Sequence, residues 1–379
     1  MPQPSHDDLI HWQQRLEIAL ARFADTDLRA TTARISEPAV HTAAAAYLTR
    51  PSKRLLGMAF LHAAHTLGHQ DTSLEDRIDI AAALEIRHGA ILLHDDIVDG
   101  DTTRGGHPTA HRALKAPFGT EAPSAALFAG NILAGLAPLP LLRSGIPAHL
   151  RIRLTDLFQD TTALVAAGQT EQLDLDRIRS AVEVTEADIL RIHSGQFAPY
   201  LLCSLQLAAA LAGLEDTVIN RIVRAGDTLC QGFQVQNDLA GYTELARILS
   251  LGDDTSEALT FANTSDLARR RRTVLVRAAL TKLSGTDHAQ MADYLAGAET
   301  DLAAVCALVE QAGAAEYCAS LISHLHAQSR DRITNDSELP ADVRTAVRTT
   351  FEYMTDLYDP SSPVSHLYLE ARSDLQPIG

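Results

Sequence analysis

The sequence predicts an all-α protein, and three observations support that prediction. Alanine and leucine dominate the composition, and both residues have high helix propensity. Aromatic residues make up only 5% of the chain. No window alternates apolar and polar residues with the period of two that marks a half-buried strand. At 379 residues the chain could hold one large domain or two smaller ones. No boundary stands out, so we expect a single domain over residues 1–379.

The net charge of −16 argues against nucleic acids and anionic membrane surfaces as partners. The four cysteines, Cys203, Cys230, Cys306 and Cys318, lie in apolar helical contexts without metal-ligand spacing. They indicate inert, buried thiols in a reduced cytoplasmic protein. The N-terminus lacks a signal-peptide pattern. We also expect no apolar run to reach the length of about 20 residues that a membrane span needs.

The first half of the chain predicts a series of helices. Residues 1–35 should contain an amphipathic helix, roughly Asp7 to Phe23, whose acidic start suits the helix dipole. A second helix is predicted from Arg54 to Leu67. The stretch from Glu85 to Asp99 has no proline, and its first part is rich in helix-forming residues, so it should end a long helix.

That helix end carries three aspartates. Asp95 and Asp99 are four residues apart and should project side by side, with Asp96 about 100° around the helix from Asp95. Carboxylates crowded on an apolar helix repel one another unless cations bind there. Carboxylate oxygens suit Mg²⁺, which often binds one or two carboxylates together with substrate phosphates. A solvated acidic helix end is the simpler alternative.

Residues 100–109 follow as a turn-rich loop that contains one arginine, Arg104. A guanidinium next to a metal-carboxylate cluster suits a phosphate ligand. The loop therefore favours the metal-site interpretation of the aspartates.

These residues together resemble the motifs of the trans-prenyl diphosphate synthase family, also called polyprenyl synthetases. That family carries an ExxH sequence, then DDxxD, then a loop with Arg-Arg-Gly and Pro-Thr. The matching residues are Glu85, His88, Asp95, Asp96, Asp99, Arg104, Gly106, Pro108 and Thr109.

The resemblance extends through most of the chain and implies an isoprenoid synthase-type helical bundle around a deep central cavity. It also implies an allylic prenyl diphosphate as substrate, three Mg²⁺ ions per active site and a homodimer. Asp95, Asp96, Asp99 and Arg104 would be the catalytic residues, and His88 would bind substrate.

The middle of the chain alternates predicted loops and helices. A loop over 115–123 should precede a helix at Ala125–Leu136, and prolines mark the next connection. Residues 150–176 predict a long helix. Its internal Gly168 suggests close helix packing or ligand approach. The next helix, Thr185 to Leu211, is interrupted by Pro199.

The family pattern is eroded where relatives bind diphosphates. The local pattern of Lys53 and Arg54 alone favours ordinary basic residues at a helix start, but the two match the Lys-Arg pair of the segment that binds the homoallylic diphosphate in relatives. Leu56 and Gly105 stand where that site has further arginines.

The allylic diphosphate site departs from the pattern as well. Gln196 and Phe197 occupy the places of a substrate-binding Lys-Thr pair. Phe197 could stabilise a carbocation through its ring or belong to the core.

The second metal motif of the family, FQxxDDxxD, is degenerate here. Gln234, Asn237 and Asp238 match it, but Gly241 replaces the last carboxylate. The resemblance assigns metal binding to Asp95, Asp99 and Asp238, with Asn237 offering a carbonyl ligand. A terpene cyclase pattern matches only weakly at the same place.

The C-terminal part supplies a further cation and the expected tail. Arg271, within a run of arginines at 269–272, falls on a phosphate-binding lysine of relatives, and residues 250–265 suggest a lid. The tail over 359–379 contains proline and serine and is expected to be loose. The predicted pocket-floor residues Ala90 and Ile91 lie one turn before Asp95, where relatives that make shorter chains often carry large aromatic residues, so the resemblance implies room for a long prenyl chain.

Three functions are compatible with these observations. The first is an enzyme that ionises a C15–C20 allylic diphosphate and either transfers the cation to a non-standard acceptor or cyclises it. The second is an ordinary synthase that condenses isopentenyl diphosphate with an allylic diphosphate, as geranylgeranyl diphosphate synthases do. The third is a non-catalytic partner subunit. The complete DDxxD argues against the third and the losses at Leu56 and Gly105 against the second, so the first is preferred. The sequence does not identify the acceptor.

Overall fold

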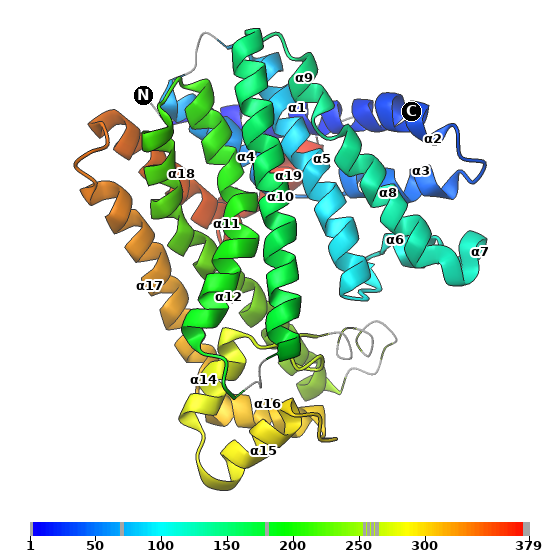
Figure 1. Ribbon diagram of the computed structural model, residues 1–379, viewed down its shortest axis with the longest axis vertical. Helices are drawn as coiled ribbons and strands as arrows, with labels where there is room; N and C mark the ends of the chain where they lie inside the picture. Colours follow the sequence, from blue (N-terminus) through cyan, green and yellow to red (C-terminus); the bar gives the residue numbers. More distant parts are fainter. Residues whose placement is uncertain are drawn as a thin grey trace. The chain divides into compact units, whose positions relative to one another are not determined.

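The computed structural model describes residues 3–68, 72–178, 182–252, 255, 258, 261 and 265–373. These residues are helical almost throughout, and one short hairpin forms the only sheet within the described ranges (Figure 1). The prediction of an all-α fold is confirmed.

The chain divides into two compact units, and neither is a continuous stretch. Unit 1 comprises Met1–Gln159, Cys203–Ile222 and Asp336–Gly379, and unit 2 comprises Asp160–Leu202 and Val223–Asn335. The expectation of a single domain stays a prediction.

Unit 1 is built mainly from the N-terminal helices and the C-terminal ones. Its elements are α1 (His6–Phe23), the π-helix η1 (Ala24–Leu28), α2 (Arg29–Thr32), α3 (Ala39–Thr49), α4 (Leu55–Leu67), α5 (Leu74–Val98), β1 (Thr103–Arg104), β2 (His107–Pro108), α6 (Ala110–Ala113), α7 (Lys115–Phe118), the 3₁₀-helix η2 (Gly119–Glu121), α8 (Ala122–Leu136), α9 (Leu139–Arg143), α18 (Ala341–Tyr358), η3 (Pro363–His366) and α19 (Leu367–Ser373).

Among its described residues, unit 2 contains α14 (Val274–Lys282), α15 (Gly285–Leu295), α16 (Leu302–Gln311) and α17 (Ala314–Asn335). Three of the four unit boundaries fall within long helices, α10 (Ala148–Ile178), α11 (Glu186–Leu211) and α12 (Asp216–Leu251), and the fourth falls at the end of α17.

Helix α5 is the central element of unit 1. It begins where the Ser73 side chain accepts a hydrogen bond from the Asp76 N–H, a standard N-terminal cap. Its alanine, isoleucine and leucine side chains are buried against α4, α8 and α1. The helix ends at Val98, with Asp99 as its C-cap. The prediction that the aspartate motif lies at the end of a long helix is confirmed.

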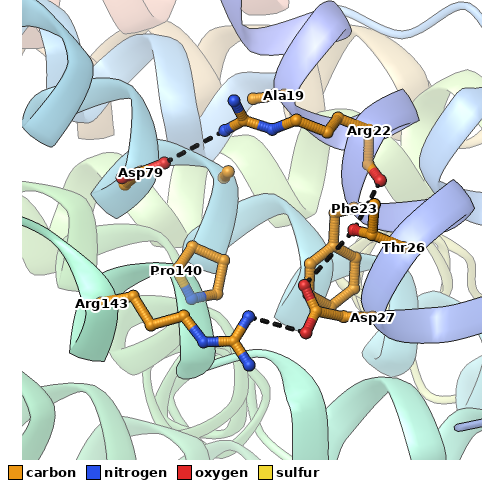
Figure 2. A pocket seen from close by; sticks show the side chains of 9 residues that line it. Ala19, Arg22, Phe23, Thr26, Asp27, Asp79, Pro140 and Arg143 are labelled. Atoms are coloured by element: carbon orange, nitrogen blue, oxygen red, sulfur yellow. Dashed lines mark hydrogen bonds and ion pairs between the residues drawn. The ribbon is translucent and has the colours of Figure 1, made fainter. Parts of the chain in front are cut away.

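The N-terminal helix α1 matches its prediction and is fixed at both ends. Ser5 and Asp8 form a capping box at its start. At its far end the chain widens into the π-helix η1, and two ion pairs join this region to neighbouring helices (Figure 2). Arg22 lies 3.7 Å from Asp79 of α5, and Arg143 of α9 lies 2.7 Å from Asp27. The four charged side chains surround a cavity of about 190 Å³.

Two predicted irregular segments are instead helical. The expected loop over 115–123 forms α7, η2 and the start of α8. The tail expected to be loose from residue 359 forms η3 and α19, and Leu367 and Ala371 of α19 are buried. Helix α19 packs on α1, so tertiary burial outweighs the local proline and serine signals. Residues 374–379 lie outside the described residues.

The expectation about membrane spans needs a similar correction. The run Lys115–Arg143, made of successive helices, has the length and composition of a span, with a mean hydropathy of 1.8 in its most apolar window. Only 39% of that window is buried. Helices of soluble proteins can meet the same criteria, so one such run is weak evidence for a membrane span.

Unit 2 has its own apolar core, formed by α14–α17 with parts of α11 and α12. Within it, α10 and α11 approach so closely that a Cβ on Gly168 would collide with the backbone of Gly195. The close packing predicted for Gly168 is confirmed. All four cysteines are free and buried, as expected. Most of the predicted lid, namely 253–254, 256–257, 259–260 and 262–264, lies outside the described residues.

Candidate active site

The hairpin β1–β2 presents Arg104 beside the end of α5. Its register pairs Arg104 with His107 and leaves Gly105 and Gly106 as a two-residue turn. Both glycines have positive φ, +58° and +74°, as tight hairpin turns of this length require. This conformation strongly favours glycine over arginine at position 105.

Arg104 is held by Asp96. The Arg104 Nε atom donates to Asp96 Oδ1 over 2.5 Å, and Tyr47 Oη donates to Asp96 Oδ2 over 2.5 Å. The Asp96 side chain is fully buried, so both of its oxygens are used within the protein. In this structure Asp96 holds the Arg104 side chain in place, and its catalytic role stays a prediction. Tyr47 has no sequence signal of its own, and only the fold brings it here.

The charges of this group are set by burial and pairing. Burial raises the pKa of Asp96, and the bonds from Arg104 and Tyr47 oppose that shift. Burial also raises the pKa of Tyr47, and its hydrogen bond to Asp96 adds to the effect. For Arg104, burial lowers the pKa, but Asp96, Asp95 and Asp101 together outweigh that effect and the net shift is upward. Burial and pairing thus shift the pKa of all three groups upward.

Asp95 and Asp99 differ from Asp96 in their exposure. Asp95 keeps a third of its side chain exposed (32%), and its Oδ2 atom lies 3.6 Å from Arg104 Nη2. Asp99, the C-cap of α5, is half-buried and one turn further along. The prediction that these two carboxylates share a face is consistent with this placement.

These carboxylates fit a Mg²⁺ ion that is bound jointly by the protein and a phosphate-containing substrate. Within the part of the chain that the structure describes, no group of three or more His, Cys, Asp or Glu side chains could hold a metal ion. Two carboxylates one turn apart fit an ion that takes its other ligands from phosphates and water. Asp95 and Asp99 are the residues placed to supply them.

A cavity of about 470 Å³ lies next to this group, within unit 1. Arg104, Gly105 and His88 of α5 are among the residues that line it. His88 Nδ1 lies 3.6 Å from Glu85 Oε2, and Glu85 Oε1 accepts the Gly57 N–H over 2.8 Å. The cavity therefore combines basic side chains with a carboxylate that is already engaged. The other lining residues are Tyr47, Arg50, Pro51, Ser52, Arg54, Gly89, Leu92, His107 and Tyr368.

Arg54 is engaged within the protein in this structure, and its role in binding substrate stays a prediction. Its side chain is 2% exposed and forms a two-pronged ion pair with the buried Glu17 of α1, at 2.8 and 2.9 Å. Its Nη2 atom also donates to the carbonyl oxygens of Leu48 and Arg50. Arg54 thus anchors the segment before α4 to α1. It adopts positive φ (50°), so α4 begins one residue later than predicted.

Lys53 is also engaged within the protein. Its Nζ atom donates to the Leu357 carbonyl at the end of α18, over 3.0 Å. Burial lowers its pKa, and the nearby Asp359 carboxylate opposes that shift. The predicted role of Lys53 in binding substrate would require the ammonium to leave this helix end.

The predicted pocket floor lies on the same helix as the aspartates. Ala90 is 2% exposed and Ile91 is half-buried. Their role in setting prenyl chain length stays a prediction.

The second motif lies on α12 in unit 2. Asp238 is only 8% exposed, and its Oδ1 atom accepts a hydrogen bond from the Gln234 amide over 3.3 Å. Burial raises its pKa, and the Asp266 charge adds to this effect. His193 Nε2 lies 3.8 Å from Asp238 Oδ2. Asn237 is exposed.

The arrangement around Asp238 parallels that of the first motif. In each adjacent pair, Asp95–Asp96 and Asn237–Asp238, the second residue is buried and the first is not. His193, which the sequence did not single out, is 6% exposed and lies three residues before Gln196 on α11. The metal-binding roles of Asn237 and Asp238 stay predictions.

Gln196 and Phe197 are brought into contact with other side chains of unit 2. The Gln196 amide donates to Gln169 Oε1 over 3.0 Å and also to Gln172. Phe197 is half-buried, and its ring lies 5.4 Å from that of Tyr200. Both alternatives for Phe197, core packing and cation stabilisation, stay open.

Arg271 keeps a partly exposed guanidinium, 27% of its side chain, with Nε 3.5 Å from Asp266 Oδ1. Its charge lowers the pKa of Asp238 against the larger effect of burial. Arg271 therefore belongs to the same group as Asp238, but its role at a diphosphate stays a prediction.

The sequence also matches known proteins. A family model described as polyprenyl synthetase matches residues 37–312. The chain is 31% identical over 241 residues to the geranylgeranyl diphosphate synthase of Mycobacterium tuberculosis. This alignment covers 63% of this chain and 63% of that relative. It is 23% identical over 321 residues to a short chain isoprenyl diphosphate synthase of Methanothermobacter thermautotrophicus, covering 84% and 91%. The match thus spans less than two thirds of the first relative and most of the second.

Solved structures match over almost the whole chain. The geranylgeranyl pyrophosphate synthase of Corynebacterium glutamicum, in complex with isoprenyl diphosphate and magnesium, has a TM-score of 0.70 and 25% identity. That comparison covers 92% of this chain and 99% of the other. A decaprenyl diphosphate synthase of Rhodobacter capsulatus, at 20% identity, shares the fold with a TM-score of 0.68, covering 94% of this chain and 100% of that one.

Proposed function

The chain belongs to the polyprenyl synthetase family, and we propose that it is a trans-prenyl diphosphate synthase that condenses isopentenyl diphosphate with an allylic prenyl diphosphate. One observation supports this function above the others. The basic cavity that Arg104 and His88 border lies directly beside the aspartate motif. The aspartate motif can bind the diphosphate of the allylic substrate, which is released in the reaction. The cavity can bind the diphosphate of isopentenyl diphosphate, which remains attached to the product.

The first step breaks the allylic C–O bond and leaves diphosphate and a delocalised carbocation. Asp95 and Asp99 would hold Mg²⁺, which neutralises the charge on the leaving diphosphate when it is bound. Arg104 adds a fixed cation at the same helix end, and Asp96 and Tyr47 hold that cation in place. We propose three Mg²⁺ ions, the others held with help from Asp238 and Asn237.

In the second step, the double bond of isopentenyl diphosphate attacks the carbocation, and the product loses a proton to the diphosphate released in the first step. Here the chain must hold the second substrate still and exclude water, because water would quench the cation. His88 and the other basic side chains of the cavity would bind its diphosphate.

A second function rests on a different observation. Gly241 lacks the final carboxylate of the second motif, and Gln196 stands where a cationic side chain is expected. Transfer to a non-standard acceptor, or cyclisation, would need only the ionisation step. The sequence matches favour elongation, since the similar proteins are named as prenyl diphosphate synthases.

The product and the assembly are also proposals. Small side chains at Gly89 and Ala90 support a long product, in the C20 range. A homodimer is supported by apolar side chains that α8 leaves exposed, Leu127 at 43% and Phe128 at 63%. A second copy of the chain would bury them. We place this acidic protein in the cytoplasm.

The test is product analysis by mass spectrometry with Mg²⁺ and C10, C15 or C20 allylic diphosphates, each with and without isopentenyl diphosphate. Elongation requires a product five carbons longer that forms only when isopentenyl diphosphate is present. A hydrocarbon or alcohol formed without it would instead establish the cyclase. Binding of the allylic substrate without turnover would support a partner subunit.

A further inference from the structure

The basic cavity lacks arginine at both positions where relatives carry it, and the structure shows why. Leu56 is fully buried in α4, so a guanidinium there would lose its hydration in an apolar core. Gly105 occupies the hairpin turn at φ +58°, where side chains other than glycine are strained. Any compensating charge must come from another part of the chain.

Arg50, the residue after α3, is positioned to supply that charge. Its Nη2 atom donates to the Pro108 carbonyl over 2.7 Å, and its guanidinium lies 5.0 Å from the centre of the Tyr47 ring. These two contacts hold the group beside the cavity, whose lining includes Arg50. Its Nη1 atom is buried and has no hydrogen-bond partner among the residues that the structure describes.

The charges near Arg50 leave its cation only partly compensated. Asp96 is the nearby carboxylate, but its oxygens already accept from Tyr47 and Arg104. Burial lowers the pKa of Arg50, and the Arg104 charge acts in the same direction, against Tyr47 and Asp96. An anion in the cavity would give Nη1 an acceptor and restore the balance.

We propose that Arg50 binds the diphosphate of isopentenyl diphosphate in this cavity, in place of the arginines absent at positions 56 and 105. The inference rests on the proposed function, because it names a binding residue for the second substrate of that reaction. Arg50 lies outside every motif by which the sequence resembles its family, so only its fold neighbours indicate the role.

The cavity does not contain Asp95 or Asp99, so its anion binding should not need metal. Isothermal titration calorimetry with isopentenyl diphosphate, in EDTA at pH 7.5, can therefore measure it directly. Losing one charge-assisted hydrogen bond should weaken binding to Arg50→Met by about 10- to 100-fold. Arg50→Lys should recover part of that loss, because it keeps the charge but not the paired donors.

The matched control is Arg112→Met, which removes an exposed arginine from α6 that does not line the cavity. Its dissociation constant should equal that of the wild type. Kinetics with Mg²⁺ supply a second measurement. Arg50→Met should raise KM for isopentenyl diphosphate and leave KM for the allylic substrate within about two-fold. Thermal unfolding of each variant checks the fold.

The outcomes separate the inference from the proposed function. If the wild type elongates its substrate and Arg50→Met binds isopentenyl diphosphate as tightly as Arg112→Met does, the inference is overturned and the function stands. An increase confined to KM of the allylic substrate also overturns it. If the wild type neither binds nor uses isopentenyl diphosphate, the proposed function fails, and the inference fails with it. Should Arg50→Met not fold, Arg50→Lys decides between these outcomes by the same measurements.

Discussion

Tyr47 of α3 donates a hydrogen bond over 2.5 Å to Asp96, the middle carboxylate of the aspartate motif at the end of α5. This contact divides the motif into two kinds of residue. Asp96 is buried and orients Arg104, whereas Asp95 keeps part of its surface for a ligand. Adjacent and chemically identical residues thus have different surroundings, because the helix turns one toward the protein and the other away from it.

Tyr47→Phe should weaken both the fold and the site. The phenol also accepts the Ala110 N–H over 3.1 Å, so the variant leaves two buried polar groups without a partner. We expect the free energy of unfolding to fall by about 1–3 kcal/mol, and kcat to fall as Arg104 loses its fixed orientation. Urea denaturation and steady-state kinetics measure these effects. The control Tyr317→Phe removes a hydroxyl bonded to Glu186 in unit 2 and should leave kcat unchanged. Equal kcat for both variants would contradict the role of Tyr47.

Substitutions of the three aspartates of the motif should differ in their effects on stability and on Mg²⁺-dependent activity. Asp95→Ala and Asp99→Ala should lower Mg²⁺-dependent kcat/KM by about 100-fold or more. They should change the free energy of unfolding by no more than about 0.5 kcal/mol. Asp96→Ala leaves the largely buried Arg104 without its closest partner and should cost about 3–5 kcal/mol of stability. Magnesium titrations of activity and urea denaturation give the two values. Similar stability losses for all three variants would contradict this division.

The buried pair Glu17–Arg54 should be structural and not catalytic. Glu17→Ala leaves the Arg54 cation buried and should cost about 3–5 kcal/mol of stability. The double variant Glu17→Leu with Arg54→Met should recover most of this loss and keep KM for isopentenyl diphosphate near the wild-type value. Asp25→Ala, which breaks the exposed pair with Arg29, is the control and should cost less than about 1 kcal/mol. A large rise in KM for the folded double variant would return Arg54 to the substrate site.

Stability should decrease in mild acid because of buried histidines such as His62. Burial lowers the pKa of His62 to about 3, from an ordinary value of 6.5. Between these values the unfolded chain binds a proton that the folded protein does not. The free energy of unfolding therefore falls as the pH drops below about 6.5, by up to about 1.4 kcal/mol per pH unit for this residue.

Replacing His62 by Gln removes the titrating group. Unfolding should then take up about one proton fewer, and the slope should decrease accordingly. Urea denaturation between pH 5.0 and pH 7.5, in steps of about half a unit, measures the slope. The exposed His11→Gln is the control and should leave the slope as in the wild type. An unchanged slope for His62→Gln would mean that His62 titrates alike in both states.

Ala90→Phe should shorten the product. Ala90 is buried on α5, about one turn before Asp95, where a phenyl ring would fill space for the growing chain. We expect the longest product to lose at least one five-carbon unit, and stability to fall by about 1–3 kcal/mol from overpacking. Mass spectrometry of products measures the length. Ala279→Phe, at a fully buried position of α14, should lower stability and leave product length unchanged. Unaltered length in Ala90→Phe would remove this residue from the pocket floor.

Local sequence patterns predicted the helices but not their partners. The end of α5 and the position of its aspartates follow from helix propensity and spacing, which are properties of neighbouring residues. Arg54 could not be assigned in the same way. Its partner Glu17 lies on another helix, and nothing in the sequence around Arg54 indicates that it is buried. The prediction of a loose tail is wrong for the same reason, since its proline and serine residues do not indicate that Leu367 and Ala371 are buried.

The candidate site shows the same division. The sequence by itself determined the all-α class, the family and the carboxylates of the first motif, because periodicity and motif spacing are properties of the sequence. Only the tertiary structure decided which carboxylate faces inward, that Arg54 is locked to Glu17, and that Tyr47 and Arg50 reach the site from α3 and its end. Contacts between distant segments depend on how helices pack, and packing is settled by shape and burial across the whole unit.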